Sequence, residues 1–217
     1  MCLDGSELAD ANKLIPQTYE IRHRKTGDLS LFSDFLRYAL LQKGLGLYVD
    51  CDVYCLKPIE DADFIVGWFR DDLVANAVLK LPPDCPALLD LCSIPINRQF
   101  IPPWFSNSKR VKFKLRGLIG RGRVEDLPWG SIGPTALTYF LREHNLFSYA
   151  QPSDVFYPIP SDQFNQLFDP ELCVADLITH RTVSLHLSNT VLKQRLDSFI
   201  PKNCPLDELV QFSVVSP

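Results

Sequence analysis

Asp50 and Asp52, two carboxylates one residue apart, are the residues in this sequence best suited to chemistry. They follow the apolar run 44–49, which predicts a buried strand. Side chains two residues apart on a strand point to the same face, so their Cα atoms would lie roughly 6.5 Å apart. Two carboxylates this close need a counter-charge, and a divalent cation that also binds a phosphate-bearing substrate supplies it. The first hypothesis is a cation site in a nucleotide-dependent transferase.

A helix over residues 30–43 must position this pair. Ser30 is expected to cap its start, apolar residues recur at helical spacing, and Gly44 is expected to end it. The apolar residues are Leu31, Phe32, Phe35, Leu36, Ala39 and Leu40. A helix that passes through a short glycine turn into an apolar strand predicts an α/β fold, with ligands at the carboxyl end of the strand.

The rest of the chain continues this α/β pattern. Short apolar runs predict strands over 64–69, 75–81 and 182–187, and the last of these places His186 beside Ser188. Residues 85–94 predict a helix. Another helix should start at Pro134, which suits the first helical position and leaves Gly133 at the amino end.

Composition narrows the class of protein. With 217 residues, the chain can bury one core, and we expect a single domain over 1–217. The net charge of −4 gives no reason to expect nucleic acid. No apolar stretch approaches the ~18 residues of a spanning helix, and the start lacks signal-peptide features, so we expect a cytoplasmic location. The seven cysteines lack the C-x-x-C spacing of a zinc site and are expected as free thiols.

The segment 109–123 carries the clearest local charge imbalance. Its basic residues are Lys109, Arg110, Lys112, Lys114, Arg116, Arg121 and Arg123. Apolar and basic residues alternate over 111–116, which predicts a strand with one cationic face or an interfacial segment. A solvated loop is the default interpretation. The functional alternative is peripheral docking of Lys109–Arg123 on anionic lipid near a membrane-borne acceptor.

Residues 32–38, the glycine turn 44–46 and the run 47–58 together closely resemble the sugar-binding region of the Asp-x-Asp (DXD) glycosyltransferases. Relatives there include the initiating α-1,6-mannosyltransferase, α-1,4-galactosyltransferase and clostridial glucosylating toxins. Bacterial polysaccharide-type members are most similar, through 76–82, 127–138 and 186–189. The resemblance spans 8–195, and 196–217 is expected to be a C-terminal helix and tail.

This resemblance implies a GT-A-like, Rossmann-like α/β domain that lacks the family's first strand and helix. It also implies a UDP- or GDP-sugar donor, Mn²⁺ or Mg²⁺, retained anomeric configuration, and a glycan or glycolipid acceptor. Asp34 and Arg37 would hold hydroxyls of the donor sugar. Asp50 would bind the ribose and the metal, and Asp52 the metal that bridges the diphosphate. These four are the expected catalytic residues.

Three further residues complete the candidate site. Asn76 would line the donor pocket, and Gly133 would place a helix amino end beside the diphosphate. His186 is a candidate third metal ligand. Two of these have an ordinary alternative: His186 as a hydrogen-bonded packing histidine, and Gly133 as part of a packed turn. Asp34 and Arg37 could likewise form a solvated surface ion pair.

Departures from the family pattern keep two alternatives open. Relatives usually carry Trp at the position of Ser188, and the base pocket would use the upstream strand and helix. A degenerate, non-catalytic protein that binds a nucleotide sugar or a partner is therefore the alternative function. A haloacid-dehalogenase-like phosphatase is a minor one, since that motif wants Thr or Val where this chain has Tyr54. The sequence leaves the sugar, the acceptor, the linkage and the oligomeric state open.

Overall fold

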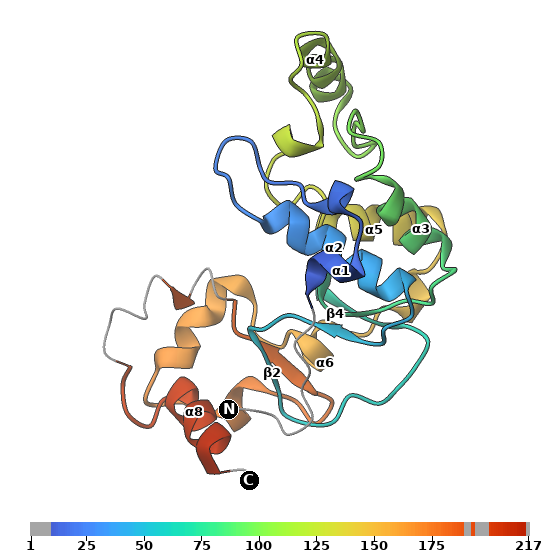
Figure 1. Cartoon of the computed structure of the whole chain (residues 1–217). Helices are drawn as coiled ribbons and strands as arrows, with labels where there is room; N and C mark the ends of the chain where they lie inside the picture. The colour runs from blue at the N-terminus through green and yellow to red at the C-terminus, as the bar shows by residue number, and fades with distance from the viewer. Residues whose placement is uncertain (1–9, 189–191, 194–199, 216–217) are drawn as a thin grey trace. The chain divides into compact units, whose positions relative to one another are not determined.

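The computed structural model describes residues 10–188, 192–193 and 200–215 (Figure 1). Helices and small sheets alternate along the chain, so the expected α/β class is confirmed. The chain divides into two compact units, Met1–Tyr48 with Lys80–Ser148 and Val49–Leu79 with Tyr149–Pro217. The expectation of one domain stays a prediction. Among these described residues, no helix has the length and apolar character to cross a membrane.

The first unit is built from helices. Its elements are α1 (Ala11–Leu14), η1 (Gln17–Tyr19), α2 (Ser30–Gln42), α3 (Pro86–Ser93), α4 (Asn107–Gly117), η2 (Val124–Asp126) and α5 (Pro134–Glu143), with η3 (Phe147–Tyr149) at the boundary. The helix predicted over 30–43 is confirmed, but the prediction of Ser30 as its cap is wrong. Ser30 is the first helical residue, and its backbone N–H donates to the Asp28 carboxylate at 3.0 Å.

The core of the first unit forms where α2 packs on α3 and α3 packs on α5. Tyr38 of α2 is fully buried, and its hydroxyl donates to the carbonyls of Ile132 and Gly133 at 3.1 and 3.2 Å. These hydrogen bonds tie α2 to the start of α5, where Pro134 is the first helical residue, as predicted. These two hydrogen bonds therefore hold the amino end of α5 against the buried face of α2.

The helix α4 corrects the strand prediction for the basic segment. Val111, Phe113 and Leu115 alternate with basic residues, yet 107–117 are helical. Phe113 is buried on one side of the helix, while Val111 and Leu115 are exposed. An apolar residue on each side of a helix produces a spacing of two, which imitates the period of a strand.

Among the described residues, the strands lie in the second unit, except for Tyr48 and Lys80 at its boundary. Its elements are β1 (Tyr48–Val49, at the boundary), β2 (Val53–Cys55), β3 (Ile65–Arg70), β4 (Leu73–Lys80), α6 (Ser153–Phe156), η4 (Ser161–Phe168), η5 (Val174–Leu177), β5 (Ser184–His186) and α8 (Pro205–Val215). The strands predicted over 64–69, 75–81 and 182–187 are confirmed as β3, β4 and β5. The predicted tail is helical over α8, while 196–199 and 216–217 lie outside the described residues.

A three-stranded sheet in the order β1-β4-β3 forms the centre of the second unit. Only Asp71 and Asp72 separate β3 from β4, so these neighbours form an antiparallel hairpin. Gly67 in β3 allows α6 to approach, because a Cβ there would lie 2.8 Å from the Phe156 ring. The sheet and α6 therefore pack closely at this glycine.

A second, two-stranded sheet pairs β2 with β5 in antiparallel fashion. Tyr54 lies opposite Leu185, and both pack against a hydrophobic cluster that includes residues of η4 and α8. The adjacent pair, Val53 and His186, points to the other face, because successive side chains on a strand alternate. This register turns His186 away from the hydrophobic cluster.

Candidate metal centre

Asp50 and Asp52 lie in a tight turn between β1 and β2, not on one continuous strand as predicted. The Val53 N–H donates to the Asp50 carbonyl at 3.1 Å and closes the turn. Asp50 N–H donates to the Ala77 carbonyl of β4 at 2.7 Å, and the Asp52 carbonyl accepts from Leu187 N–H at 2.8 Å. Backbone hydrogen bonds to both sheets of the second unit therefore fix the position of the turn.

The turn also decides which way the Asp52 side chain points. If β2 continued through Asp52, that residue would lie opposite Leu187. Its side chain would then point to the same face of the sheet as Leu187, and His186 points to the opposite face. Instead His186 Nε2 lies 3.3 Å from Asp52 Oδ1. The backbone turn therefore brings together two side chains that a regular strand would separate.

Ligand atoms of Asp50, Asp52 and His186 all lie within 4.8 Å of one another, and the three residues are half-buried. Two carboxylates and an imidazole at this separation suit a divalent cation. His186 Nδ1 is buried and has no hydrogen-bond partner among the described residues. This observation disfavours the interpretation of His186 as a fully hydrogen-bonded packing histidine.

Tyr157 orients the His186 ring, and the sequence analysis missed this residue. The two rings meet edge to face, with centroids 5.9 Å apart and an interplanar angle of 87°. The Tyr157 hydroxyl accepts a hydrogen bond from Val78 N–H of β4 at 2.9 Å, so the ring is anchored on the central sheet. Because Tyr157 lies far from His186 in sequence, no local pattern could have indicated the contact.

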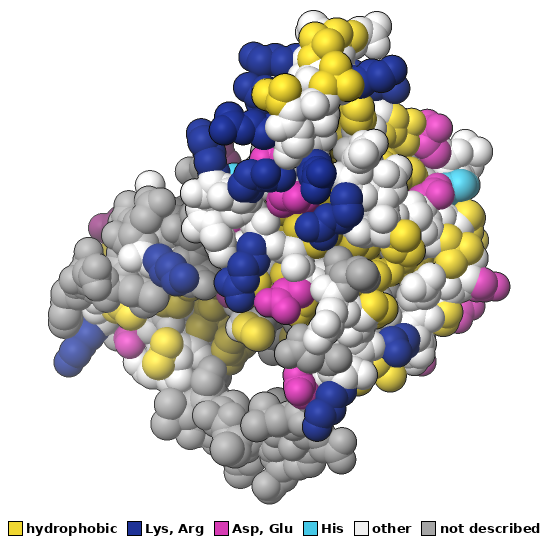
Figure 2. Space-filling model, turned by 45° about the horizontal axis from the view of Figure 1, so that its top comes forward, with side chains coloured by type: hydrophobic (Ala, Val, Ile, Leu, Met, Phe, Trp, Pro, Cys, Tyr) yellow, Lys and Arg dark blue, Asp and Glu magenta, His cyan; other side chains and the backbone are white. Residues whose placement is uncertain are grey.

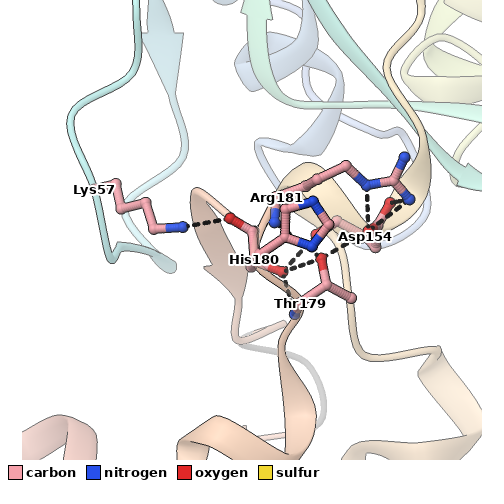
Figure 3. Close-up of polar contacts among 6 residues, drawn as sticks. Lys57, Asp154, Thr179, His180 and Arg181 are labelled. Atoms are coloured by element: carbon pink, nitrogen blue, oxygen red, sulfur yellow. Dashed lines mark hydrogen bonds and ion pairs between the residues drawn. The ribbon is translucent and has the colours of Figure 1, made fainter.

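An ion-pair network holds the chain just before β5 (Figure 3). Asp154 of α6 accepts hydrogen bonds from the Thr179 hydroxyl at 2.8 Å and from Nε and Nη2 of Arg181 at 3.0 Å each. Lys57 Nζ donates to the His180 carbonyl at 2.8 Å from the opposite side. Paired carboxylate contacts of this kind with Arg restrict geometry, so the network sets the start of the strand that carries His186.

The charge state of Asp154 follows from the same contacts. Burial acts to raise the pKa of Asp154, but hydrogen bonds from Thr179 and Arg181, with the Arg181 charge, lower it below its ordinary value. A carboxylate with a lowered pKa stabilises the fold above its unfolded-state pKa and loses this contribution as the pH falls. The contacts of Asp154 that fix the start of β5 are therefore expected to weaken in acid.

Asp34 and Arg37 form an ion pair on α2, in the first unit. Arg37 Nε lies 3.7 Å from Asp34 Oδ1 and donates to the Ser33 carbonyl at 3.4 Å. The guanidinium carbon lies 4.7 Å from the centroid of the Tyr48 ring. Arg37 is 5% exposed, and the Asp34 side chain is 15% exposed. Because both side chains are largely buried, the interpretation as a solvated surface pair is disfavoured.

Asn76 is buried within β4, in the second unit. Gly133 precedes α5 in the first unit, and its carbonyl accepts from the Tyr38 hydroxyl and from Leu137 N–H at 3.1 Å. The structure thus brings Asp50, Asp52 and His186 together within the second unit. The proposed contributions of Asp34, Arg37, Asn76 and Gly133 to a common site stay predictions.

Ser188, where the family resemblance leads us to expect Trp, has a backbone φ of 48°. Residues other than Gly adopt this left-handed region rarely, and bulky ones least of all. The small side chain therefore suits the conformation of this chain better than an aromatic side chain would.

Comparison with known proteins places this geometry in context. Residues 2–76 match the model of the family described as glycosyltransferase sugar-binding region containing DXD motif. The match covers about a third of the chain and includes Asp34, Arg37, Asp50 and Asp52. No curated protein sequence and no solved structure matches the chain significantly. The resemblance found in the sequence is confirmed at the level of the family, and it indicates a glycosyltransferase-type role.

Proposed function

We propose that the chain is a metal-dependent, GT-A-type glycosyltransferase that transfers a sugar, with retained configuration, from a UDP- or GDP-sugar to a glycan or glycolipid acceptor. The observation that carries the proposal is the convergence of Asp50, Asp52 and His186 within 4.8 Å. The first two of these residues lie inside the segment that matches the DXD family. The family match supports the reaction class, and the three-residue group supports metal dependence.

Asp50, Asp52 and His186 would hold the cation through two carboxylate oxygens and one imidazole nitrogen. We favour Mn²⁺ over Mg²⁺, because Mg²⁺ is bound almost entirely by oxygen ligands and Mn²⁺ tolerates a nitrogen more readily. The bound ion would offset the negative charge that develops on the nucleoside diphosphate as it leaves. Tyr157 and the Asp154 network would keep the imidazole in position for this role.

Asp34 and Arg37 would bind the hydroxyls of the donor sugar. Asp34 can accept hydrogen bonds from hydroxyl groups, and Arg37 can donate them. Contacts of Arg37 with Ser33 and with the Tyr48 ring restrict its guanidinium, so little conformational entropy would be lost on binding. In the same proposal, Asn76 lines the donor pocket and the amino end of α5 at Gly133 faces the diphosphate.

A protein that binds the donor without transferring sugar is the second candidate. Ser188 favours this alternative, since the stacking surface that an aromatic residue would provide is missing there. The phosphatase alternative receives no such support. Tyr54, at the position where that class needs Thr or Val, packs against the hydrophobic cluster of the second unit.

Donor hydrolysis tests the proposal. The purified chain is mixed with UDP- and GDP-sugars in the presence of Mn²⁺, and release of the nucleoside diphosphate is measured without an acceptor. We expect slow release from one donor, abolished by EDTA and restored by added Mn²⁺. The anomeric configuration of the first sugar released, read by proton NMR, should match that of the donor.

Asp52→Asn should reduce the Mn²⁺-dependent rate of nucleoside diphosphate release by a factor of about 100 or more, because a metal ligand is lost. Asp72→Asn is the matched control, since Asp72 is a highly exposed carboxylate in the β3–β4 connection of the same unit. Mn²⁺-dependent nucleotide binding without turnover would favour the non-catalytic alternative. No release and no such binding by calorimetry, across all donors, would refute both.

A further inference from the structure

The helix α4 has almost no contact with the core of its own unit. Figure 1 shows α4 apart from α2, α3 and α5, at the end of a segment that extends away from them. Phe113 is its one buried residue. A helix held by a single buried side chain leaves most of its surface available for another partner.

Exposed apolar side chains form a stripe on α4 that continues into the turn after it. Val111 and Leu115 of α4 are 59% and 60% exposed, and Leu118 and Ile119 of the turn are 82% and 73% exposed. Successive residues of a helix turn by about 100°, so Val111 and Leu115 lie on the side opposite Phe113. An open hollow runs along the stripe, also bordered by Ser108, Lys112 and Arg116. Scattered exposed apolar residues are ordinary, but four within nine residues, three of them bordering one hollow, form a patch.

Basic side chains border the stripe on both sides. The same helical geometry places Arg110 and Lys114 along one edge and Lys112 and Arg116 along the other. The segment 107–123 holds seven of the chain's 22 Lys and Arg residues and none of its 26 Asp and Glu residues. Figure 2 shows these Lys and Arg side chains gathered around hydrophobic ones at α4. Positive charge therefore accumulates on α4 and the segment that follows it, in a chain that is acidic as a whole.

Specific contacts hold α4 in this orientation. Phe113 packs edge to face on Phe105, and Lys109 Nζ lies 3.6 Å from the centroid of the same ring. The chain returns past the end of α4 through Gly122, which has φ +77°. A Cβ at Gly122 would lie 2.3 Å from the Phe113 carbonyl oxygen, so only glycine fits. The face is therefore formed before any partner binds.

We propose that α4 docks this chain on a bilayer containing anionic lipid, with the apolar stripe in the acyl boundary and the two basic rows at the headgroups. An apolar stripe between rows of Lys and Arg has the charge and polarity of an interfacial helix. The long basic side chains reach headgroup phosphates while their stems stay against the apolar layer. Nucleic acid fits less well, because Val111, Leu115, Leu118 and Ile119 offer no aromatic surface for bases to stack on.

This inference does not depend on the proposed sugar transfer. Vesicle co-sedimentation of the full chain tests it directly, with phosphatidylserine–phosphatidylcholine vesicles against vesicles of phosphatidylcholine alone. We expect binding to the anionic vesicles only, weakening as salt is added. Lys112→Gln/Lys114→Gln/Arg116→Gln should reduce that binding at least about tenfold, because each charge near the surface contributes to attraction.

Matched variants separate the contribution of α4 from bulk properties of the surface. Lys25→Gln/Lys43→Gln/Lys202→Gln removes three exposed charges outside α4 and should leave binding unchanged. Ile119→Gln should weaken binding severalfold, whereas Ile96→Gln, at 71% exposure against 73%, should not. Circular dichroism checks that each variant is folded.

Four results would overturn the proposal. The first is the absence of binding to anionic vesicles at low salt. The second is equal binding by the α4 variants and their controls, which would mean that another surface is responsible. If Ile119→Gln binds like the unmodified chain, the apolar stripe does not insert and the proposed docking is wrong. Binding to a protein or to nucleic acid, with none to anionic vesicles, would also contradict it.

Discussion

The helices α2 and α4 belong to the same unit and have similar lengths, 13 and 11 residues, but they use their charges in opposite ways. The apolar face of α2 packs on α3, and its Asp34–Arg37 pair is largely buried. On α4 one phenylalanine is buried, and the charges surround an exposed apolar stripe. The difference shows that an amphipathic pattern does not by itself decide which face turns inward. A neighbouring element has to be available to receive it.

The largest expected effect is on the core contact of α2. Phe35→Ala should lower the free energy of unfolding by about 3–5 kcal/mol, because Phe35 is fully buried and its removal leaves a cavity. Leu115→Ala on α4 should change it by less than about 0.5 kcal/mol, since Leu115 is mostly exposed. Urea unfolding followed by circular dichroism gives both values. Similar losses for the two variants would mean that α4 has a core partner after all.

A smaller effect is expected from the charged side chains. Arg37→Met should lower the free energy of unfolding by about 3 kcal/mol, because it removes a buried guanidinium that faces the Asp34 carboxylate. Asp34→Asn/Arg37→Met should recover part of the loss, since no buried carboxylate then remains at position 34. Arg116→Met on α4 is the control, with a change of less than about 0.5 kcal/mol. The same urea experiment measures all three, and a neutral Arg37→Met would contradict the buried pairing.

The smallest effect concerns the starts of the two helices. Hydrogen bonds from the Ser30 hydroxyl, from Thr26 and from the Ser30 N–H lower the pKa of Asp28 from 3.8 to about 2. Because of this lowered pKa, ionised Asp28 stabilises the fold at pH values above its unfolded-state pKa. The stabilisation disappears as the pH falls through about 2. Asp28→Asn should therefore lower the midpoint of thermal unfolding near neutral pH and have no effect below about pH 2.

Ser106 before α4 gives the comparison for this pH dependence, because its side chain makes no capping hydrogen bond. Ser106→Ala should shift the midpoint equally at all pH values, or not at all. The idea fails if the difference between Asp28→Asn and the unmodified chain is the same in acid and near neutrality. Thermal melts by circular dichroism across the acid range provide the test.

The same contrast explains which parts of the fold could be predicted. Over α2, six apolar residues recur at helical spacing, and three of them, Leu31, Phe35 and Ala39, are buried, so the pattern identified the helix and part of its inward face. The hairpin strands β3 and β4 and the start of α5 at Pro134 were also clear from local signals. In α4, Phe113 is buried on one face while Val111 and Leu115 are exposed on the opposite face. In the sequence, these three residues form one alternating apolar pattern. Local periodicity cannot separate faces when apolar residues occupy both.

For the candidate metal centre, residue types were predicted more reliably than geometry. Asp50 and Asp52 were identified as a cation-binding pair, but they occupy a turn that donates a hydrogen bond to β4 and accepts one from Leu187, the residue after β5. A regular strand would have directed Asp52 away from His186. The contact of Tyr157 with His186, and the Asp154 network before β5, join segments far apart in the chain. Such contacts depend on the folded arrangement and leave no spacing pattern.

The sequence by itself determined the carboxylate pair, the helix that precedes it, the α/β class, the family resemblance and the concentration of basic residues on one segment. These properties follow from residue type and short-range spacing, which local physical chemistry can interpret. Only the tertiary structure decided that His186 lies 3.3 Å from Asp52 and that the basic segment is a helix with an exposed apolar stripe. Both depend on which distant segments pack together, because packing determines which side chains converge and which face is left to solvent.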